Sequence, residues 1–376
     1  MTALIHSPLE STLLSPAAQK ALGPGPGKSM ASRGLMPLAP ADQVAVLYQL
    51  SLDNDQAIVQ AARATASELP DKLLAGTLAD PRLDARVLDF FALLAGSKPA
   101  VFDAIVDNAA AADSTIATLA TKGGPREVDR IAQNEQRLLR HPEIIGAMYL
   151  NKRARMSTVD RVVELAVRNQ VRVPNLAVWD EVARALAAPH SAADAEADAL
   201  FAYAADALSG DDSALTSGDA EAVLEEEETL ELATPEEAQL SIDKMSIPSK
   251  IRLATLGNAF ARNVLIRDPI RMVSVAAIKA PGVTEVEAAR YASNQTLPED
   301  VIRFIANKRE WTKRYGIKVS LCRNAKTPIP DAARLMPFLR DRELQNLARS
   351  KGVSSSLVAQ ARKLMQQRRG GSDKKS

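Results

Sequence analysis

Cysteine is almost absent from the 376-residue chain, which contains only Cys322. One thiol excludes an internal disulfide and a zinc site made of several cysteines, so we expect a buried Cys322 in a reducing compartment. Histidine is equally scarce: His6, His141 and His190 lie far apart, and none has a second His or a Cys three or four positions away. Because metal coordination needs several converging ligands, the sequence predicts no metal site.

Long apolar runs and aromatic residues are also scarce. No stretch reaches the roughly 18 consecutive apolar residues of a membrane-spanning helix, and residues 1–20 lack a basic start followed by an apolar run. Aromatic residues make up 4% of the chain, whereas hydrophobic residues, drawn from Ala, Leu, Val and Ile, make up 46%. This composition suits closely packed helices better than sheets. We therefore expect an all-α, cytoplasmic protein that binds no membrane.

Signatures of catalysis are missing as well. The run that ends in Gly27-Lys28-Ser29 is similar to the end of a phosphate-binding loop, but that loop requires a second glycine where this chain has Leu22. It also requires a buried strand before it and a long helix after it, whereas the flanks here are rich in proline. No Gly-x-Ser-x-Gly motif is present. We expect no catalysis, no cofactor and no small-molecule substrate.

Charge is distributed very unevenly, although the net charge is only +1. Residues 1–184 are neutral overall, residues 185–243 contain 16 acidic and no basic residues, and residues 244–376 carry a net charge of +17. Such segregation is typical of polyanion binding, or of an acidic segment that shields a basic domain.

Helical periodicity and composition together predict the domain organisation. Residues 1–40 are rich in proline and glycine and are expected to form a disordered arm. Two helical blocks, residues 41–184 and 245–366, flank an acidic linker over residues 185–244, in which one docking helix is expected around Phe201. Residues 367–376 are expected to fray.

One spacing occurs twice, 215 positions apart: an Asp, an apolar residue five positions later, and then an Ala pair. Its members are Asp53, Ile58, Ala61 and Ala62, and Asp268, Val273, Ala276 and Ala277. Asp can accept hydrogen bonds from the first turn of a helix, and the alanines let a second helix approach closely. This pattern resembles the second helix of a HEAT-type repeat. The resemblance implies an α-solenoid of helical hairpins in the two blocks.

Two weaker recurrences give an expected repeat length. The run from Leu138 to Pro142 recurs at an offset of 127, and the pair Asn151 and Met156 corresponds to Asn324 and Ile329 at an offset of 173. The resulting units lie 46 residues apart. HEAT-like repeats have a period of roughly 40 to 47 residues.

Basic and aromatic residues interleave in one short segment of the C-terminal block. The candidate polyanion-binding residues are Lys308, Arg309, Trp311, Lys313 and Arg314. Cations neutralise phosphates and an exposed tryptophan can stack on bases. However, Trp311 and Tyr315 are four residues apart, as core residues of a helical hairpin are, so the ring fits either a buried core or an exposed platform.

Three functional hypotheses follow. A solenoid presents an extended ridge suited to gripping a macromolecule, which favours a non-catalytic scaffold with a protein partner. The basic C-terminal block favours nucleic acid or another polyanion as the alternative partner. Enzymes that resemble DNA glycosylases provide the third hypothesis, but no specific Asp and Trp pair marks it. A contiguous Lys/Arg surface would favour nucleic acid, and scattered charges would favour a protein.

Overall fold

The computed structural model describes residues 6–23, 26–94, 98–187, 194–208, 212–216 and 242–372. These residues form helices and no strand, which confirms the all-α prediction. None of the described helices is both long enough and apolar enough to cross a membrane. The chain divides into two compact units, Met1–Asn175 and Leu176–Ser376.

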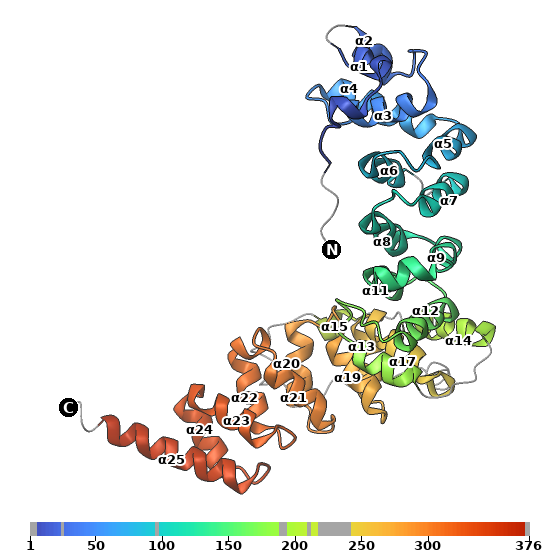
Figure 1. The fold of residues 1–376 in the computed structure, drawn as a ribbon. Coiled ribbons are helices and arrows are strands. Elements are labelled where there is room, and N and C mark those ends of the chain that lie inside the picture. Colours follow the sequence, from blue (N-terminus) through green and yellow to red (C-terminus); the bar gives the residue numbers. More distant parts are fainter. Residues whose placement is uncertain are drawn as a thin grey trace. The chain divides into compact units, whose positions relative to one another are not determined.

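The first unit consists of short helices that follow one another closely along the chain (Figure 1). They are η1 (Ser11–Leu13), α1 (Pro16–Ala21), α2 (Gly27–Ser32), α3 (Pro40–Leu50), α4 (Gln56–Glu68), α5 (Asp71–Leu78), α6 (Ala85–Ala92), α7 (Pro99–Asp107), α8 (Asp113–Lys122), α9 (Pro125–Ile131), α10 (Glu135–Arg140), α11 (Glu143–Leu150) and α12 (Met156–Arg168). Alternate helices pack on each other: α5 contacts both α3 and α7, and α8 contacts both α6 and α11.

The second unit is built in the same way (Figure 1). Its helices are α13 (Trp179–Leu186), α14 (Asp194–Ala207), α15 (Ser213–Thr216), α17 (Ile247–Leu256), α18 (Ala259–Leu265), α19 (Arg271–Lys279), α20 (Glu285–Ser293), α21 (Glu299–Asn307), η4 (Trp311–Lys313), α22 (Tyr315–Arg323), α23 (Ile329–Leu335), η5 (Met336–Phe338), α24 (Asp341–Arg349) and α25 (Ser355–Ser372). One row of contacts runs through α17, α19, α21 and α23, and another through α20, α22 and α24.

The repeated Asp-to-Ala-Ala spacing has a structural counterpart, with one correction. Asp53 and Asp268 each accept a hydrogen bond from the backbone N–H two residues later and each pair with a lysine. They therefore close the turn before α4 and α19 and do not cap the helix itself. In α19, Val273, Ala276 and Ala277 are fully buried as expected, whereas in α4 the buried positions are shifted to Val59, Ala62 and Ala66.

Three asparagines that directly follow α7, α11 and α22 tie neighbouring helical pairs together. Each donates two side-chain hydrogen bonds, of 2.7 to 3.0 Å, to carbonyls about one repeat earlier in the chain. Each also accepts one from the backbone N–H two residues later. The asparagines are Asn108, Asn151 and Asn324. This confirms the sequence correspondence between Asn151 and Asn324.

Helices of the second unit that share a row of contacts begin at a shorter interval than the expected 46 residues. The first residues of α20 and α22, Glu285 and Tyr315, are 30 residues apart, and so are those of α21 and α23. This interval is shorter than the expected 46 residues because these helices have only seven to nine residues each and are joined by short connections.

Loss of one such asparagine should be costly. Asn324→Ala should lower the free energy of unfolding by about 2–3 kcal/mol, because the buried carbonyls of Ala292 and Asn294 lose their donor. The matched control is Asn307→Ala, since Asn307 is exposed, its amide donates within its own helix to Arg303, and its one contact with another helix is a long, exposed hydrogen bond of 3.4 Å from Arg334. Chemical denaturation followed by circular dichroism measures both changes. Equal effects at the two positions would contradict the linking role of Asn324.

Residues 1–40, expected to form a disordered arm, contain the short helices η1, α1 and α2 where they are described. Helices α1 and α2 pack against α3, and Leu9, Ala18 and Ala21 are buried. Pro16 occupies the first turn of α1, where its missing N–H costs nothing, and Ser15 caps that helix. The prolines therefore start helices here, and alanines at the contacts let short helices pack closely. Residues 1–5 and 24–25 lie outside the described residues.

The acidic linker expected over residues 185–244 is also docked in part. Its first residues complete α13, and α14 confirms the docking helix, with Phe201 and Leu208 buried. The Phe201 ring lies 4.9 Å from the guanidinium carbon of Arg252, a fully buried residue of α17. The remainder, residues 188–193, 209–211 and 217–241, lies outside the described residues. The expected fraying from residue 367 does not begin there, because α25 continues to Ser372.

Candidate interaction groove

Trp311, the aromatic residue of the expected polyanion-binding cluster, belongs to the core. Only 3% of its surface is exposed, and its ring packs edge-to-face on Phe304 with a centroid distance of 6.0 Å. The ammonium of Lys308 lies 4.0 Å above the same ring. Trp311 and Tyr315 do not share a helix, because η4 ends at Lys313 and α22 begins at Tyr315. The stacking platform considered from the sequence is therefore absent from this part of the described chain.

The other residues of that cluster do not form one site either. Arg309 and Lys313 are exposed on either side of Trp311. Arg314 is also exposed, but its Nε donates to Glu285 at 2.6 Å. A similar ion pair joins Arg271 to Asp300, again 29 residues apart. Many cations of the C-terminal segment are thus used to link successive helices.

The two helices α19 and α21 present a second, different set of residues on one shared face. Arg271, Met272, Val275 and Lys279 follow each other at helical spacing along α19, and Asp300, Arg303, Phe304 and Asn307 do so along α21. Together with Glu181 and Arg184 of α13 they line a groove of about 300 Å³. We call this surface the α13–α19–α21 groove. The sequence does show a stripe of cations and apolar residues at helical spacing, which could have indicated a binding surface. It does not show which helices meet to form the groove.

Two carboxylates in the groove are each shared by two cations. Glu181, with 5% of its side chain exposed, accepts from Lys279 at 3.0 Å and from Arg184 at 3.4 Å. Asp300 pairs with Arg271 at 2.6 Å. The fourth cation, Arg303, approaches Asp300 at 3.8 Å and also pairs with Glu299 at the rim. Four cations and two acids leave the lining positively charged.

The three arginines of this lining reach solvent. Their side chains are 60% exposed in Arg184, 68% in Arg271 and 50% in Arg303. A guanidinium carries five N–H donors, more than the carboxylates here can satisfy. Between the arginines lie the apolar side chains of Met272, Val275 and Phe304. The arrangement can hold a ligand that combines carboxylates with apolar groups.

The remaining residues considered from the sequence have structural roles. Lys28 of the Gly-Lys-Ser run pairs with Asp53 at 2.7 Å, and His141 pairs with Asp113 at 2.6 Å. Burial raises the pKa of the Cys322 thiol to about 12, so this thiol stays protonated. Within the described ranges no three His, Cys, Asp or Glu side chains converge as a metal site would require. His190 lies outside those ranges.

No protein-family model, no curated protein and no solved structure matches this chain. Its function is therefore argued from the geometry of its own residues.

Proposed function

We propose that this protein is a non-catalytic, cytoplasmic scaffold, an α-solenoid of HEAT-like helical hairpins, whose α13–α19–α21 groove binds an acidic, partly apolar segment of a partner protein. The contact rows of alternate helices and the recurring asparagines support the solenoid. The groove supports the partner chemistry. The observation that carries the proposal is the pair of carboxylates shared among four cations around an apolar floor.

The two parts of the groove contribute in different ways. Exposed ion pairs contribute little affinity because water and salt screen them, so the cations mainly select and orient an acidic partner. Burial of apolar groups against Met272, Val275 and Phe304 supplies most of the binding free energy. An amphipathic segment with acidic and apolar residues on one face satisfies both requirements.

A double substitution can remove half of the cations without leaving a lining acid unpaired. In Arg184→Gln/Arg303→Gln, Glu181 keeps Lys279 and Asp300 keeps Arg271, the nearer partner in each case. We expect a synthetic peptide of alternating Glu and Leu to bind this variant about tenfold more weakly than the parent chain, equivalent to about 1.4 kcal/mol. Fluorescence anisotropy measures the affinity.

The matched control removes the same charge elsewhere in the unit. Arg342→Gln/Arg349→Gln alters two exposed arginines of α24 and should leave peptide affinity unchanged. A Lys/Leu peptide of equal length should bind the parent chain far more weakly than the Glu/Leu peptide. Equal binding of the two peptides would refute an acidic partner.

A second candidate function is binding of nucleic acid or another polyanion by the basic C-terminal segment. It is favoured by the net charge of +17 over residues 244–376 and by the exposed Arg309 and Lys313. With Trp311 buried, such binding would rest on phosphate contacts and would weaken steeply as salt rises. Arg309→Gln/Lys313→Gln should then flatten the salt dependence of binding to a thymidine oligonucleotide.

A further inference from the structure

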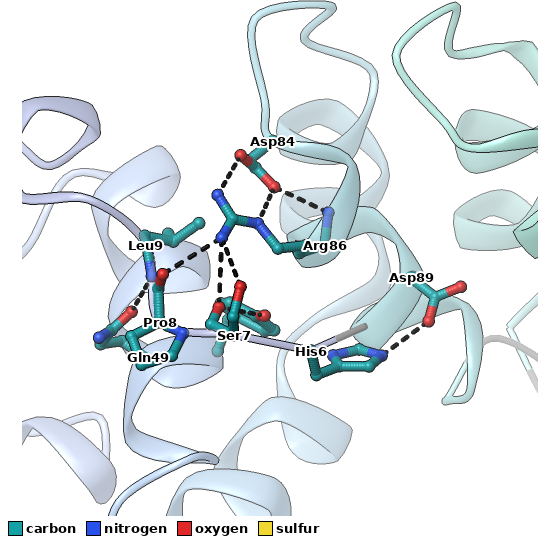
Figure 2. A network of polar contacts seen from close by, with 9 residues as sticks. His6, Ser7, Pro8, Leu9, Gln49, Asp84, Arg86 and Asp89 are labelled. Carbon is teal, nitrogen blue, oxygen red and sulfur yellow. Dashed lines mark hydrogen bonds and ion pairs between the residues drawn. The ribbon is translucent and has the colours of Figure 1, made fainter. Parts of the chain in front are cut away.

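Side chains of α3 and α6 hold the backbone of residues 6–9, a segment without helix or strand, at three consecutive positions (Figure 2). The carbonyl of Ser7 accepts from the Tyr48 hydroxyl at 2.9 Å. The carbonyl of Pro8 accepts from Arg86 at 3.2 Å, and the N–H of Leu9 donates to Gln49 at 2.8 Å. Backbone groups bound in this way by side chains are typical of a recognised peptide.

Three side chains of the segment, those of His6, Ser7 and Leu9, also make contacts of their own, whereas Pro8 is exposed. His6 Nε2 lies 2.8 Å from a carboxylate oxygen of Asp89, and the Ser7 hydroxyl accepts from Arg86 at 2.9 Å. Leu9 is buried, with 7% of its surface exposed. Pro8 has no N–H that would need an acceptor. The contacts therefore fit the order His, Ser, Pro and apolar residue.

The groups that read the segment are positioned by contacts of their own. Asp84 caps α6 and holds the Arg86 guanidinium through two hydrogen bonds of 2.8 Å. That guanidinium in turn keeps the pKa of Asp84 below its usual range. Thr115 donates to the second oxygen of Asp89. Because Arg86 and Asp89 are held by groups outside residues 6–9, these two side chains need little ordering when a peptide binds.

We propose that the surface of α3 and α6 that holds residues 6–9 is a binding site for an extended peptide of a partner protein, with the order His, Ser, Pro and apolar residue, and that residues 6–9 occupy it as a built-in competitor. Leu9 is the only strongly buried apolar side chain of the segment, so its release exposes little apolar surface and is a local event. A tethered segment acts at an effective concentration on the order of millimolar, which raises the threshold for the partner. This inference is independent of the α13–α19–α21 groove.

The test uses a full-length chain in which only the competitor is weakened. His6→Ala/Leu9→Asp removes its imidazole and its apolar anchor but leaves Tyr48, Gln49, Arg86 and Asp89 intact. The probe is a labelled peptide with the sequence of residues 6–14, followed by fluorescence anisotropy. We expect the variant to bind this peptide at least tenfold more tightly than the parent chain does.

Two matched changes in that variant locate the site. Arg86→Lys should weaken peptide binding at least tenfold, because one ammonium cannot replace a guanidinium that holds Asp84 while donating to Ser7 and Pro8. Arg82→Lys should have no effect: Arg82 forms the same kind of pair with Asp80 two residues earlier but is exposed, and its guanidinium donates to Asp80 and not to residues 6–9. Equal losses from both substitutions, or equal binding of a scrambled peptide, would overturn the proposal.

A second measurement uses the parent chain, so the result does not depend on how the variant folds. Millimolar peptide should displace the resident segment and accelerate hydrogen exchange at the Leu9 amide, which Gln49 now protects. Unchanged exchange would overturn the proposal. A parent chain that forms concentration-dependent dimers, dissociated by the peptide, would assign the occupant to a second copy and reject a separate partner protein.

Discussion

Arg262→Met should lower the free energy of unfolding of the second unit by roughly 3–5 kcal/mol, the range for removing one partner of a buried ion pair. Glu287, at 1% exposure, would lose the guanidinium that donates to both of its oxygens at 3.0 and 2.9 Å. The carbonyls of Gly257 and Gly282 would lose the same donor. Urea unfolding monitored by circular dichroism measures the loss.

The control for this prediction is an exposed ion pair of similar geometry. Arg271→Met breaks a pair with Asp300 in which the arginine is 68% exposed, and should cost no more than about 1 kcal/mol. The double variant Arg262→Met/Glu287→Leu should recover much of the stability lost in Arg262→Met, because no buried charge remains. If Arg262→Met costs no more than Arg271→Met, the pair with Glu287 does not stabilise the unit.

Ala277→Asp should be comparably damaging, with a loss of several kcal/mol. Ala277 is fully buried in α19, which packs against α17 and α21. A carboxylate there would lose its hydration at a close helix contact without a cation built to receive it. Thermal melting by circular dichroism should show a much lower melting temperature.

The same chemical change at an exposed position of the second unit provides the comparison. Ala359 lies on the exposed face of α25, so Ala359→Asp should shift the melting temperature only slightly. A variant with Asp at position 277 that melts like the parent would show that α19 does not pack through its alanine stripe.

The sequence identified features that depend on local spacing. The helical class followed from composition, and both members of the repeated Asp-to-Ala-Ala pattern lie at equivalent turns before a helix. The correspondence of Asn151 and Asn324 was visible from their flanking residues. Only the structure shows the shared role: each side chain donates to two backbone carbonyls that lie 28 to 32 residues earlier in the chain. A docking helix around Phe201 could be predicted because its few large apolar residues lie in an otherwise acidic segment.

Features that depend on distant partners could not be predicted in the same way. The prolines near the N-terminus predicted disorder. In the structure Leu9 is buried, and α1 buries two of its alanines because it packs against α3 and α2. The sequence favoured a core position for Trp311 but left an exposed platform open, and the contact of its ring with Phe304 decides for the core. The α13–α19–α21 groove needs three helices separated by up to about 100 residues of sequence, and no local pattern reveals that Lys279 meets Glu181, 98 residues away.

Photo-crosslinking from the floor of the groove tests the central claim most directly. A benzophenone amino acid at Val275, between the arginines, should capture in the cells of origin a protein segment rich in acidic and apolar residues. The yield should fall about tenfold, as the affinity does, when Arg184→Gln and Arg303→Gln are added, and should stay unchanged with Arg342→Gln/Arg349→Gln. Capture of nucleic acid, or a yield that does not respond to loss of the groove arginines, would contradict the account.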